Sequence, residues 1–225
     1  MKTVTRDGLV LSCTLAFAAG YIDAVGFVAT GGMFVSFMSG NSTQAGVEFF
    51  HDGAAQALLG FGLVLGFLVG VTLAGMFASR IEDHRRDVVG TAALAVAIVA
   101  GLELIGWSSP WWYLLVAAAM GSLNTLYLAD GRARVAITYA TGTLVSVGLG
   151  LAALFTGGSK VAWRRPLLLW GSLAVGAVAG AGLQVVHHAL SLCVGAAMLF
   201  AIATALAARR FQGPVPRWLR GTDAS

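Results

Sequence analysis

The chain alternates between long apolar runs and short polar breaks. Six of the runs approach or exceed the roughly 20 mainly apolar residues that a helix needs to cross a bilayer. They are residues 9–29, 57–79, 88–107, 111–129, 166–186 and 189–208. The pattern predicts an all-α polytopic membrane protein with six transmembrane helices.

Two further segments, residues 34–50 and 135–155, are apolar at their ends but polar inside. The first carries Ser, Asn, Thr and Gln side chains between positions 36 and 44, and the second carries a polar cluster between 138 and 143. We expect both segments to be interrupted or re-entrant, entering the membrane and returning to the side they left. Such non-helical backbone survives at membrane depth only where protein or water covers it. The alternative is that both cross fully, giving eight crossings.

The basic residues favour six crossings. Cytoplasmic loops of membrane proteins carry an excess of Lys and Arg. With the amino terminus in the cytoplasm and six crossings, all 14 Lys and Arg residues fall on the cytoplasmic side. Eight crossings would place five of them outside: Arg80, Arg85, Arg86, Arg132 and Arg134. We therefore expect a multi-pass inner-membrane protein with both termini in the cytoplasm, including a basic tail at 209–225.

The composition excludes a soluble domain and a nucleic-acid-binding protein. The chain is 58% hydrophobic and 11% charged, whereas soluble domains have roughly 45–50% apolar and about 25% charged residues. Its net charge of +4 comes from basic residues that flank apolar runs, where topology signals lie. Cys13 and Cys193 both lie inside apolar runs and form no disulfide or metal-ligand pattern.

The second half of the chain repeats features of the first. Gly20 and Asp23 match Gly121 and Asn124, Gly40 matches Gly142, and Gly66 and Gly70 match Gly176 and Gly180. We expect one membrane domain over 1–225 with two repeats, at about 9–107 and 111–208. Three crossings per repeat would make the copies inverted, as in many secondary transporters with sites near the bilayer midplane. Four crossings would make them parallel.

Three motifs resemble the YoaK family of bacterial integral membrane proteins. They are GYIDAVGF at 20–27, FMSGNST at 37–43 and GSLN at 121–124. The resemblance extends from about residue 9 to residue 208. It implies a small bacterial membrane protein, and it supplies no activity because the family has no known function.

Asp23 is the first candidate for a substrate- or ion-binding residue. A carboxylate at membrane depth costs a few kcal/mol, so it usually faces a cavity or a partner. It could bind an ion or a proton, or it could be hydrogen-bonded to a neighbouring helix. Its counterpart Asn124 is also polar, which indicates a shared polar centre.

The second candidate set comprises the polar segments Ser39, Gly40, Asn41 and Thr43, and Thr141, Gly142 and Thr143. Glycine permits sharp turns, hydroxyl and amide groups cap helix starts, and interrupted helices can meet a solute at their ends. Tight packing through small residues is the alternative. The ladder of Gly62, Gly66 and Gly70, echoed by Ser172, Gly176 and Gly180, predicts helix packing within one chain or between copies in a homo-oligomer.

Other polar residues are expected near the outer surface. Glu103 should reach the interface beside Trp107, and Gln184, His187 and His188 should lie at the outer end of the fifth long run. No metal site is expected, because adjacent residues on a helix point apart. Glu48, His51 and Asp52 should form an acidic outer loop.

These features predict a small-solute transporter or channel in the lipid bilayer, with alternating access around Asp23, Asn124 and the two polar segments. An uncharged or cationic solute fits best, because no Lys or Arg lies within the apolar runs. The sequence contains no phosphate-binding loop or hydrolase motif, so we expect no enzyme activity and no cofactor. The alternatives are an accessory or assembly protein and, less favoured, a membrane-embedded enzyme.

Overall fold

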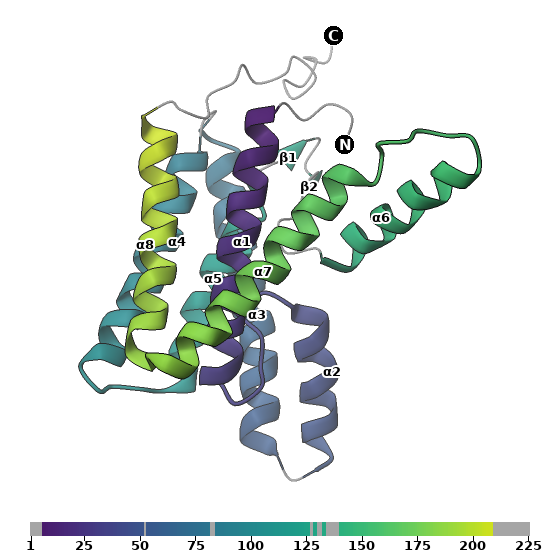
Figure 1. The fold of residues 1–225 in the computed structure, drawn as a ribbon. Helices are drawn as coiled ribbons and strands as arrows, with labels where there is room; N and C mark the ends of the chain where they lie inside the picture. The colour runs from purple at the N-terminus through teal and green to yellow at the C-terminus, as the bar shows by residue number, and fades with distance from the viewer. Residues whose placement is uncertain are drawn as a thin grey trace.

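The structure is a computed structural model that describes residues 6–51, 53–81, 84–126, 128–129, 132–133 and 140–208. Predictions that concern Asp52, Arg134, residues 1–5 and the tail 209–225 lie outside these residues. The described elements are α1 (Arg6–Ala29), α2 (Met38–Phe49), α3 (Ala54–Ala78), α4 (Arg85–Leu104), η1 (Pro110–Trp112), α5 (Tyr113–Leu123), β1 (Leu128–Ala129), β2 (Arg132–Ala133), α6 (Ala140–Phe155), α7 (Arg164–Val186) and α8 (His188–Ala207). Apart from the short β1–β2 hairpin these elements are helical, which confirms the predicted all-α class (Figure 1).

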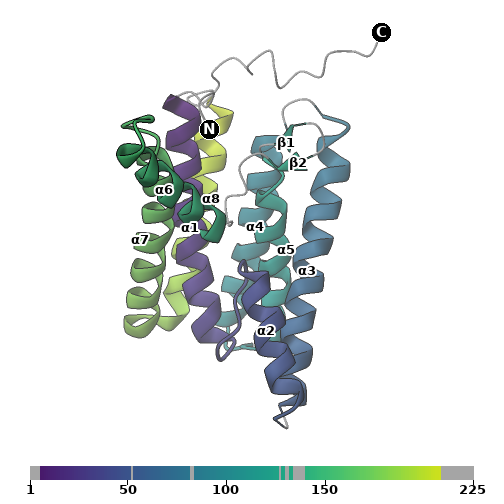
Figure 2. The same ribbon diagram turned by 90° about the vertical axis from the view of Figure 1, so that its right-hand side faces the viewer.

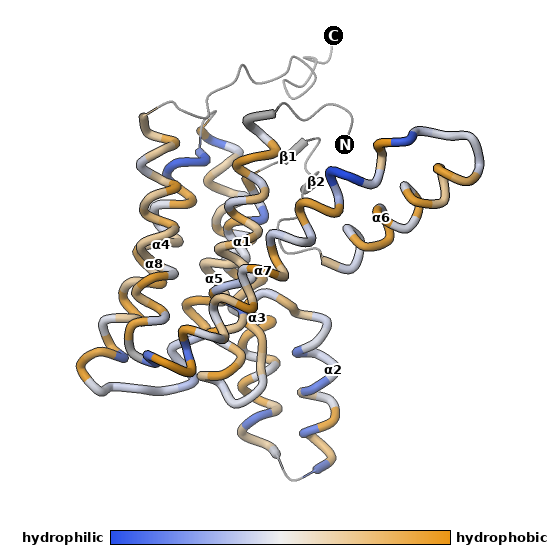
Figure 3. Tube along the Cα trace, in the orientation of Figure 1, coloured by the Kyte–Doolittle hydropathy of each residue, from blue (hydrophilic) through white to orange (hydrophobic). Residues whose placement is uncertain are grey.

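Five described helices, α1, α3, α4, α7 and α8, are long and apolar enough to cross a membrane. Their apolar residues extend along their length (Figure 3). The two segments expected to be interrupted form the short helices α2, with 12 residues, and α6, with 16 residues. At 1.5 Å per residue these helices are about 18 and 24 Å long. Neither is long enough to span a hydrocarbon core of about 30 Å alone.

The fourth run differs from its prediction, because the helix ends at Leu123 rather than continuing to residue 129. The N–H groups of Asn124 and Thr125 turn back to the carbonyls of Gly121 and Ser122, at 3.1 and 3.0 Å. The Asn124 Nδ2 donates to the Met120 carbonyl at 3.0 Å. Side chains that bind the last carbonyls in this way compete with continuation of a helix.

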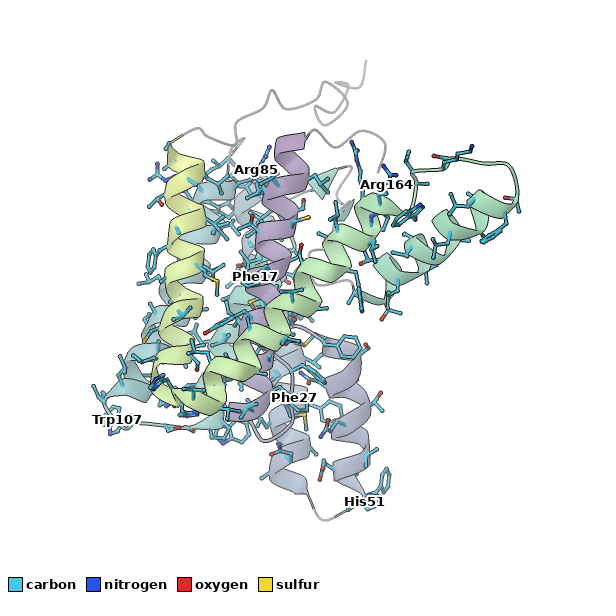
Figure 4. The ribbon with its side chains drawn as sticks, viewed as in Figure 1. Phe17, Phe27, His51, Arg85, Trp107 and Arg164 are labelled. Atoms are coloured by element: carbon cyan, nitrogen blue, oxygen red, sulfur yellow. The ribbon has the colours of Figure 1, made fainter. Side chains whose placement is uncertain are left out.

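The two ends of the bundle carry different residues (Figure 4). Arg85 and Arg164 lie at one end, here called the Arg85 end, and Trp107 and His51 lie at the other, here called the Trp107 end. α1 begins and α8 ends at the Arg85 end (Figure 1). Both described termini of the bundle therefore lie on the same side.

The short helices begin part-way along the bundle. α2 starts beside the middle of the molecule and runs to the Trp107 end, where α3 begins, so segment 30–53 returns to the end that it left (Figures 1 and 4). α6 also starts near the middle but runs towards the Arg85 end (Figures 1 and 2). This course of the chain matches the re-entrant shape expected for α2.

The main helix contacts join the two halves of the chain. α1 packs against α7, α3 against α5, and α4 against α8. Glycines lie at the first two contacts, where an added Cβ on Gly20 would overlap the Leu173 carbonyl and one on Gly121 would overlap the Phe67 carbonyl. The backbones approach closely there, as small residues allow in membrane helices.

The glycines of the predicted packing ladder lie at the same two contacts. Gly176 and Gly180 of α7 face the carbonyls of Phe17 and Tyr21, and Gly70 of α3 faces that of Ala118, again without room for a Cβ. The remaining two face Leu114 less tightly: a Cβ on Gly66 would lie 2.8 Å from its carbonyl oxygen, and one on Gly62 would lie 3.4 Å from its side chain.

Candidate functional site

Asp23 holds the chain that precedes α2. Its Oδ1 atom accepts hydrogen bonds from the N–H groups of Val35 and Ser36, at 2.8 and 2.7 Å. These two residues lie just before α2, whereas Asp23 lies inside α1. The carboxylate therefore binds the non-helical backbone of the interrupted segment, rather than the neighbouring helix considered in the sequence analysis.

Asn41 holds the same loop from the other side. Its Oδ1 accepts from the Phe34 N–H at 2.7 Å, and its Nδ2 donates to the Phe34 carbonyl at 2.6 Å. The Asn41 side chain is fully buried. The Asn41 side-chain amide thus binds both backbone polar groups of Phe34, the N–H and the carbonyl. This explains an asparagine in the FMSGNST motif.

Two further side chains complete the support of this loop. The Thr30 Oγ1 donates to the Met33 carbonyl at 2.7 Å and accepts from the Met33 N–H at 3.0 Å. The Gln56 Nε2 of α3 donates to the Thr30 carbonyl at 2.9 Å. Residues 30–37 are therefore held by side chains from α1, α2 and α3. Irregular backbone at membrane depth needs hydrogen-bond partners of this kind.

The start of α2 is a polarised site. The amino-terminal end of a helix carries a partial positive charge, and α2 begins two residues after the Ser36 N–H that Asp23 binds. The Asp23 carboxylate therefore lies on the side of the loop where it offsets the helix dipole. The partial positive charge at the start of α2 can in turn stabilise the Asp23 carboxylate inside the bundle.

Three of the predicted residues, Ser39, Gly40 and Thr43, line an open groove of about 520 Å³ along α2. The remaining lining residues are Phe34, Phe37, Gln44, Val47 and Glu48. Asn41 does not line this groove; its side chain is hydrogen-bonded to the loop before α2 instead. The Thr43 hydroxyl donates to the Ser39 carbonyl at 3.1 Å, so its oxygen lone pairs remain free to accept a hydrogen bond from a solute.

The predicted residues of the second half lie on two different helices, at the end of α5 and at the start of α6. Asn124 is buried at the end of α5. Thr141 is exposed and Thr143 half-buried in the first turn of α6, and the Gly142 carbonyl accepts from the Ser146 hydroxyl at 3.0 Å. Residues 134–139, which would correspond to the loop before α2, lie outside the described residues.

The sequence analysis named Glu103, Gln184 and His188 separately, but it did not predict that they meet in a second polar cluster. Glu103 was expected at the interface, but its side chain is only 5% exposed and its Oε2 lies 3.4 Å from the His188 Nε2. The Ser108 hydroxyl also donates to this oxygen, at 3.1 Å. The His188 Nδ1 contacts the Gln184 Nε2, and the Ser191 hydroxyl donates to the Gln184 Oε1.

This cluster joins α4, α7 and α8, so no local motif indicates it. Glu103 is half-buried and lies one residue before the end of α4, close to Trp107 as expected, but neighbouring groups cover its side chain. The i, i+3 spacing of His188 and Ser191 within α8 is a local signal for one contact of the cluster. Within the part of the chain that the structure describes, no three His, Cys, Asp or Glu side chains are grouped to hold a metal ion.

Comparison with known proteins identifies a family but no activity. Residues 11–205 match the model of a family described as "Protein of unknown function (DUF1275)". The chain is 32% identical over 208 residues to the UPF0700 transmembrane protein RA0705 of Rhizobium meliloti (strain 1021), covering 91% of this chain and 89% of the relative. No solved structure matches.

Proposed function

We propose, from the premise that this chain belongs to the DUF1275 family and is a multi-pass membrane protein, that it is a small-solute transporter or channel. The family match confirms the kind of protein that its GYIDAVGF and FMSGNST motifs indicated. The observation that carries the proposal is the interrupted segment before α2. Asp23 and Asn41 satisfy its backbone, and three of the predicted site residues line a groove beside it.

We infer that the two halves are inverted repeats. Gly20 of α1 meets the Leu173 carbonyl of α7, and Gly121 of α5 meets the Phe67 carbonyl of α3. The first helix of each half, α1 or α5, therefore packs on the third helix of the other half, α7 or α3. α2 and α6 start near mid-height and run towards opposite ends (Figures 1 and 2), which supports an inverted rather than a parallel relation.

The same contacts define which residues would correspond. Gly176 meets the Phe17 carbonyl, and Gly70 meets the Ala118 carbonyl. Phe17 and Ala118 are separated by the same number of sequence positions as Gly20 and Gly121. These contacts favour Gly70, rather than Gly66, as the counterpart of Gly176, one helical turn from the pairing expected in the sequence analysis.

The proposed mechanism is alternating access around the starts of α2 and α6. Ser39, Gly40 and Thr43 would contact the solute from one half, and Thr141, Gly142 and Thr143 from the other, while Asp23 and Asn124 support the polar centre. Inverted-repeat transporters place their sites at such interrupted helices. The groove offers hydroxyl and amide groups and the Glu48 carboxylate, which suits an uncharged or cationic solute.

Alanine at Gly40 should slow solute passage, whereas alanine at Gly46 of the same helix should not. A Cβ on Gly40 would lie 2.5 Å from the Phe37 ring and 3.1 Å from the Phe34 ring, so both rings would have to move. Gly46 has nothing within 4 Å of the added carbon. Both variants can be reconstituted into vesicles and tested by light scattering with glycerol and urea, and by tracer uptake with methylammonium.

The transport proposal is refuted if vesicles containing the wild-type protein admit none of these solutes faster than protein-free vesicles. Flux that is equal in the two glycine variants would remove the groove from the pathway. Copurification of a stoichiometric partner, together with absent flux, would favour the assembly role instead.

We also infer that the Arg85 end faces the cytoplasm of an inner membrane, with both termini inside. The inference rests on the positive-inside rule and on the location of Arg85 and Arg164 at one end (Figure 4). In a chain with Cys13 and Cys193 replaced by serine, His51→Cys should react with an impermeant maleimide in intact cells. Arg86→Cys should react only after permeabilisation, and its labelling from outside would reverse the orientation.

A further inference from the structure

The groove along α2 has a different chemical character at each of its two ends. At the start of α2 it is lined by the rings of Phe34 and Phe37, whose centroids are 5.3 Å apart in an edge-to-face arrangement. The Phe27 ring of α1 supports Phe34 at 4.7 Å. At the other end lies Glu48, one residue before α2 ends. The groove therefore joins an aromatic wall to a carboxylate.

The lining residues of α2 define an elongated site. They recur every three or four positions from Gly40 to Glu48, so they lie along one face of the helix. Asn41 and Ala45, which lie between them in the sequence, are buried. At 1.5 Å per residue, Gly40 and Glu48 are separated by about 12 Å along the helix axis. A ligand that contacts both ends of the groove must therefore be elongated.

The charges around the groove favour a cation at the Glu48 end. A helix carries a partial positive charge at its start and a partial negative charge at its end, so the end of α2 adds to the attraction of Glu48. Among the described residues, none forms an ion pair or hydrogen bond with the Glu48 carboxylate, and none of the lining residues is Lys or Arg. Asp23 does not line the groove, because its carboxylate binds the backbone before α2.

We propose that this groove binds an elongated organic cation, whose ammonium group pairs with Glu48 and whose apolar part packs against the rings of Phe34 and Phe37. An aromatic ring suits this apolar part best, because it can add an edge-to-face contact to the existing pair. The proposal rests on the proposed function in that it names the class of solute that the transporter would carry.

The location of the two ends in the bundle agrees with this orientation. Phe27, which packs on Phe34, lies part-way along the bundle, and His51, three residues after Glu48, lies at the Trp107 end (Figure 4). The ammonium group would thus lie towards the Trp107 end and the ring towards the middle. A charge is costly at the centre of a bilayer, so the opposite orientation is disfavoured.

Two probes with the same ring and chain test the Glu48 end. Phenylbutylammonium carries a positive charge, and phenylbutanol is its neutral counterpart. Their affinities can be measured by equilibrium dialysis with the protein in lipid nanodiscs, and empty nanodiscs give the partition into lipid. We expect the wild type to bind the ammonium about fivefold more tightly, as a partly exposed ion pair allows. Glu48→Gln should remove this preference by weakening only the binding of the ammonium.

The aromatic end is tested by Phe37→Leu, which should weaken the binding of both probes about fivefold and leave the preference for the ammonium intact. Phe50→Leu is the matched control. Phe50 forms an edge-to-face pair with Phe49 at the same centroid distance of 5.3 Å, but neither ring lines the groove. This variant should bind both probes as the wild type does. Phe34→Leu replaces Phe37→Leu if circular dichroism shows that the latter is unfolded.

The proposal is overturned if the wild type binds both probes equally, or if the preference for the ammonium persists in Glu48→Gln. An equal loss of affinity in Phe37→Leu and Phe50→Leu would also overturn it. Binding is measured separately from flux, so the two proposals can fail independently. The expected pattern of binding without flux in vesicles would support this site and refute transport, whereas flux without the preference would refute only the organic-cation site.

Discussion

Replacing Gly20 with alanine should destabilise the protein strongly, by about 3 kcal/mol or more, at the upper end of what overpacking costs in a well-packed interior. The added carbon would overlap the Leu173 carbonyl of α7. That atom belongs to the backbone of a 23-residue helix, so it cannot move aside as the end of a side chain can. α1 and α7 would have to separate along the whole contact.

Thermal unfolding in detergent, followed by circular dichroism and by loss of the monodisperse peak on size exclusion, measures this effect. Gly121→Ala should behave like Gly20→Ala, because its Cβ would overlap the Phe67 carbonyl at the α3–α5 contact. Gly90→Ala in α4 is the control, since nothing lies within 4 Å of the added carbon. It should be neutral or slightly stabilising, because alanine is the better helix former.

A Gly20→Ala variant as stable as Gly90→Ala would show that the α1–α7 contact is looser than described. Loss of stability at Gly20 but not at Gly121 would argue against equivalent roles for the two contacts. It would therefore weaken the inverted-repeat proposal while leaving the membrane fold unaffected.

The helices were predictable because lipid imposes a simple length rule. Five of the six predicted runs correspond to long helices, and the two polar segments correspond to the short helices α2 and α6. The run at 111–129 was overestimated, because hydropathy does not register that Asn124 and Thr125 bind the preceding carbonyls. An apolar residue count cannot locate a helix end that side-chain hydrogen bonds determine.

Helix pairing was not predictable in the same way. Nearly every face of these helices is apolar, so hydropathy does not distinguish a face that contacts lipid from one that contacts protein. The glycines indicated close packing, but not that α1 would meet α7 rather than α3. Glu103 illustrates the same difficulty, because its partner His188 lies 85 positions away on another helix.

The polar centre was predictable in composition but not in bonding. A carboxylate at membrane depth must have a partner, and the sequence singled out Asp23 and Asn41. Their partners are backbone groups of Val35, Ser36 and Phe34, and every residue carries such groups. Only the path of the loop decides which of them a side chain reaches.

Asparagine and alanine at Asp23 should have different effects, because the residue combines an acceptor with a charge. Asn can offer its Oδ1 to the N–H groups of Val35 and Ser36, as the carboxylate does at 2.8 and 2.7 Å. Asp23→Asn should therefore fold with nearly wild-type stability. Asp23→Ala leaves both N–H groups without a partner, at a cost of about 1–3 kcal/mol for each group, and should unfold at a much lower temperature.

Measurements of solute flux test the role of the negative charge of Asp23. If Asp23 takes part in transport, Asp23→Asn should abolish any pH dependence of solute entry into reconstituted vesicles while the loop stays intact. Unchanged pH-dependent flux in this variant would remove Asp23 from the mechanism and leave it as the anchor of α2. Destabilisation of Asp23→Asn to the level of Asp23→Ala would mean instead that the loop needs the full negative charge. The start of α2 would then be held chiefly by its helix dipole acting on Asp23.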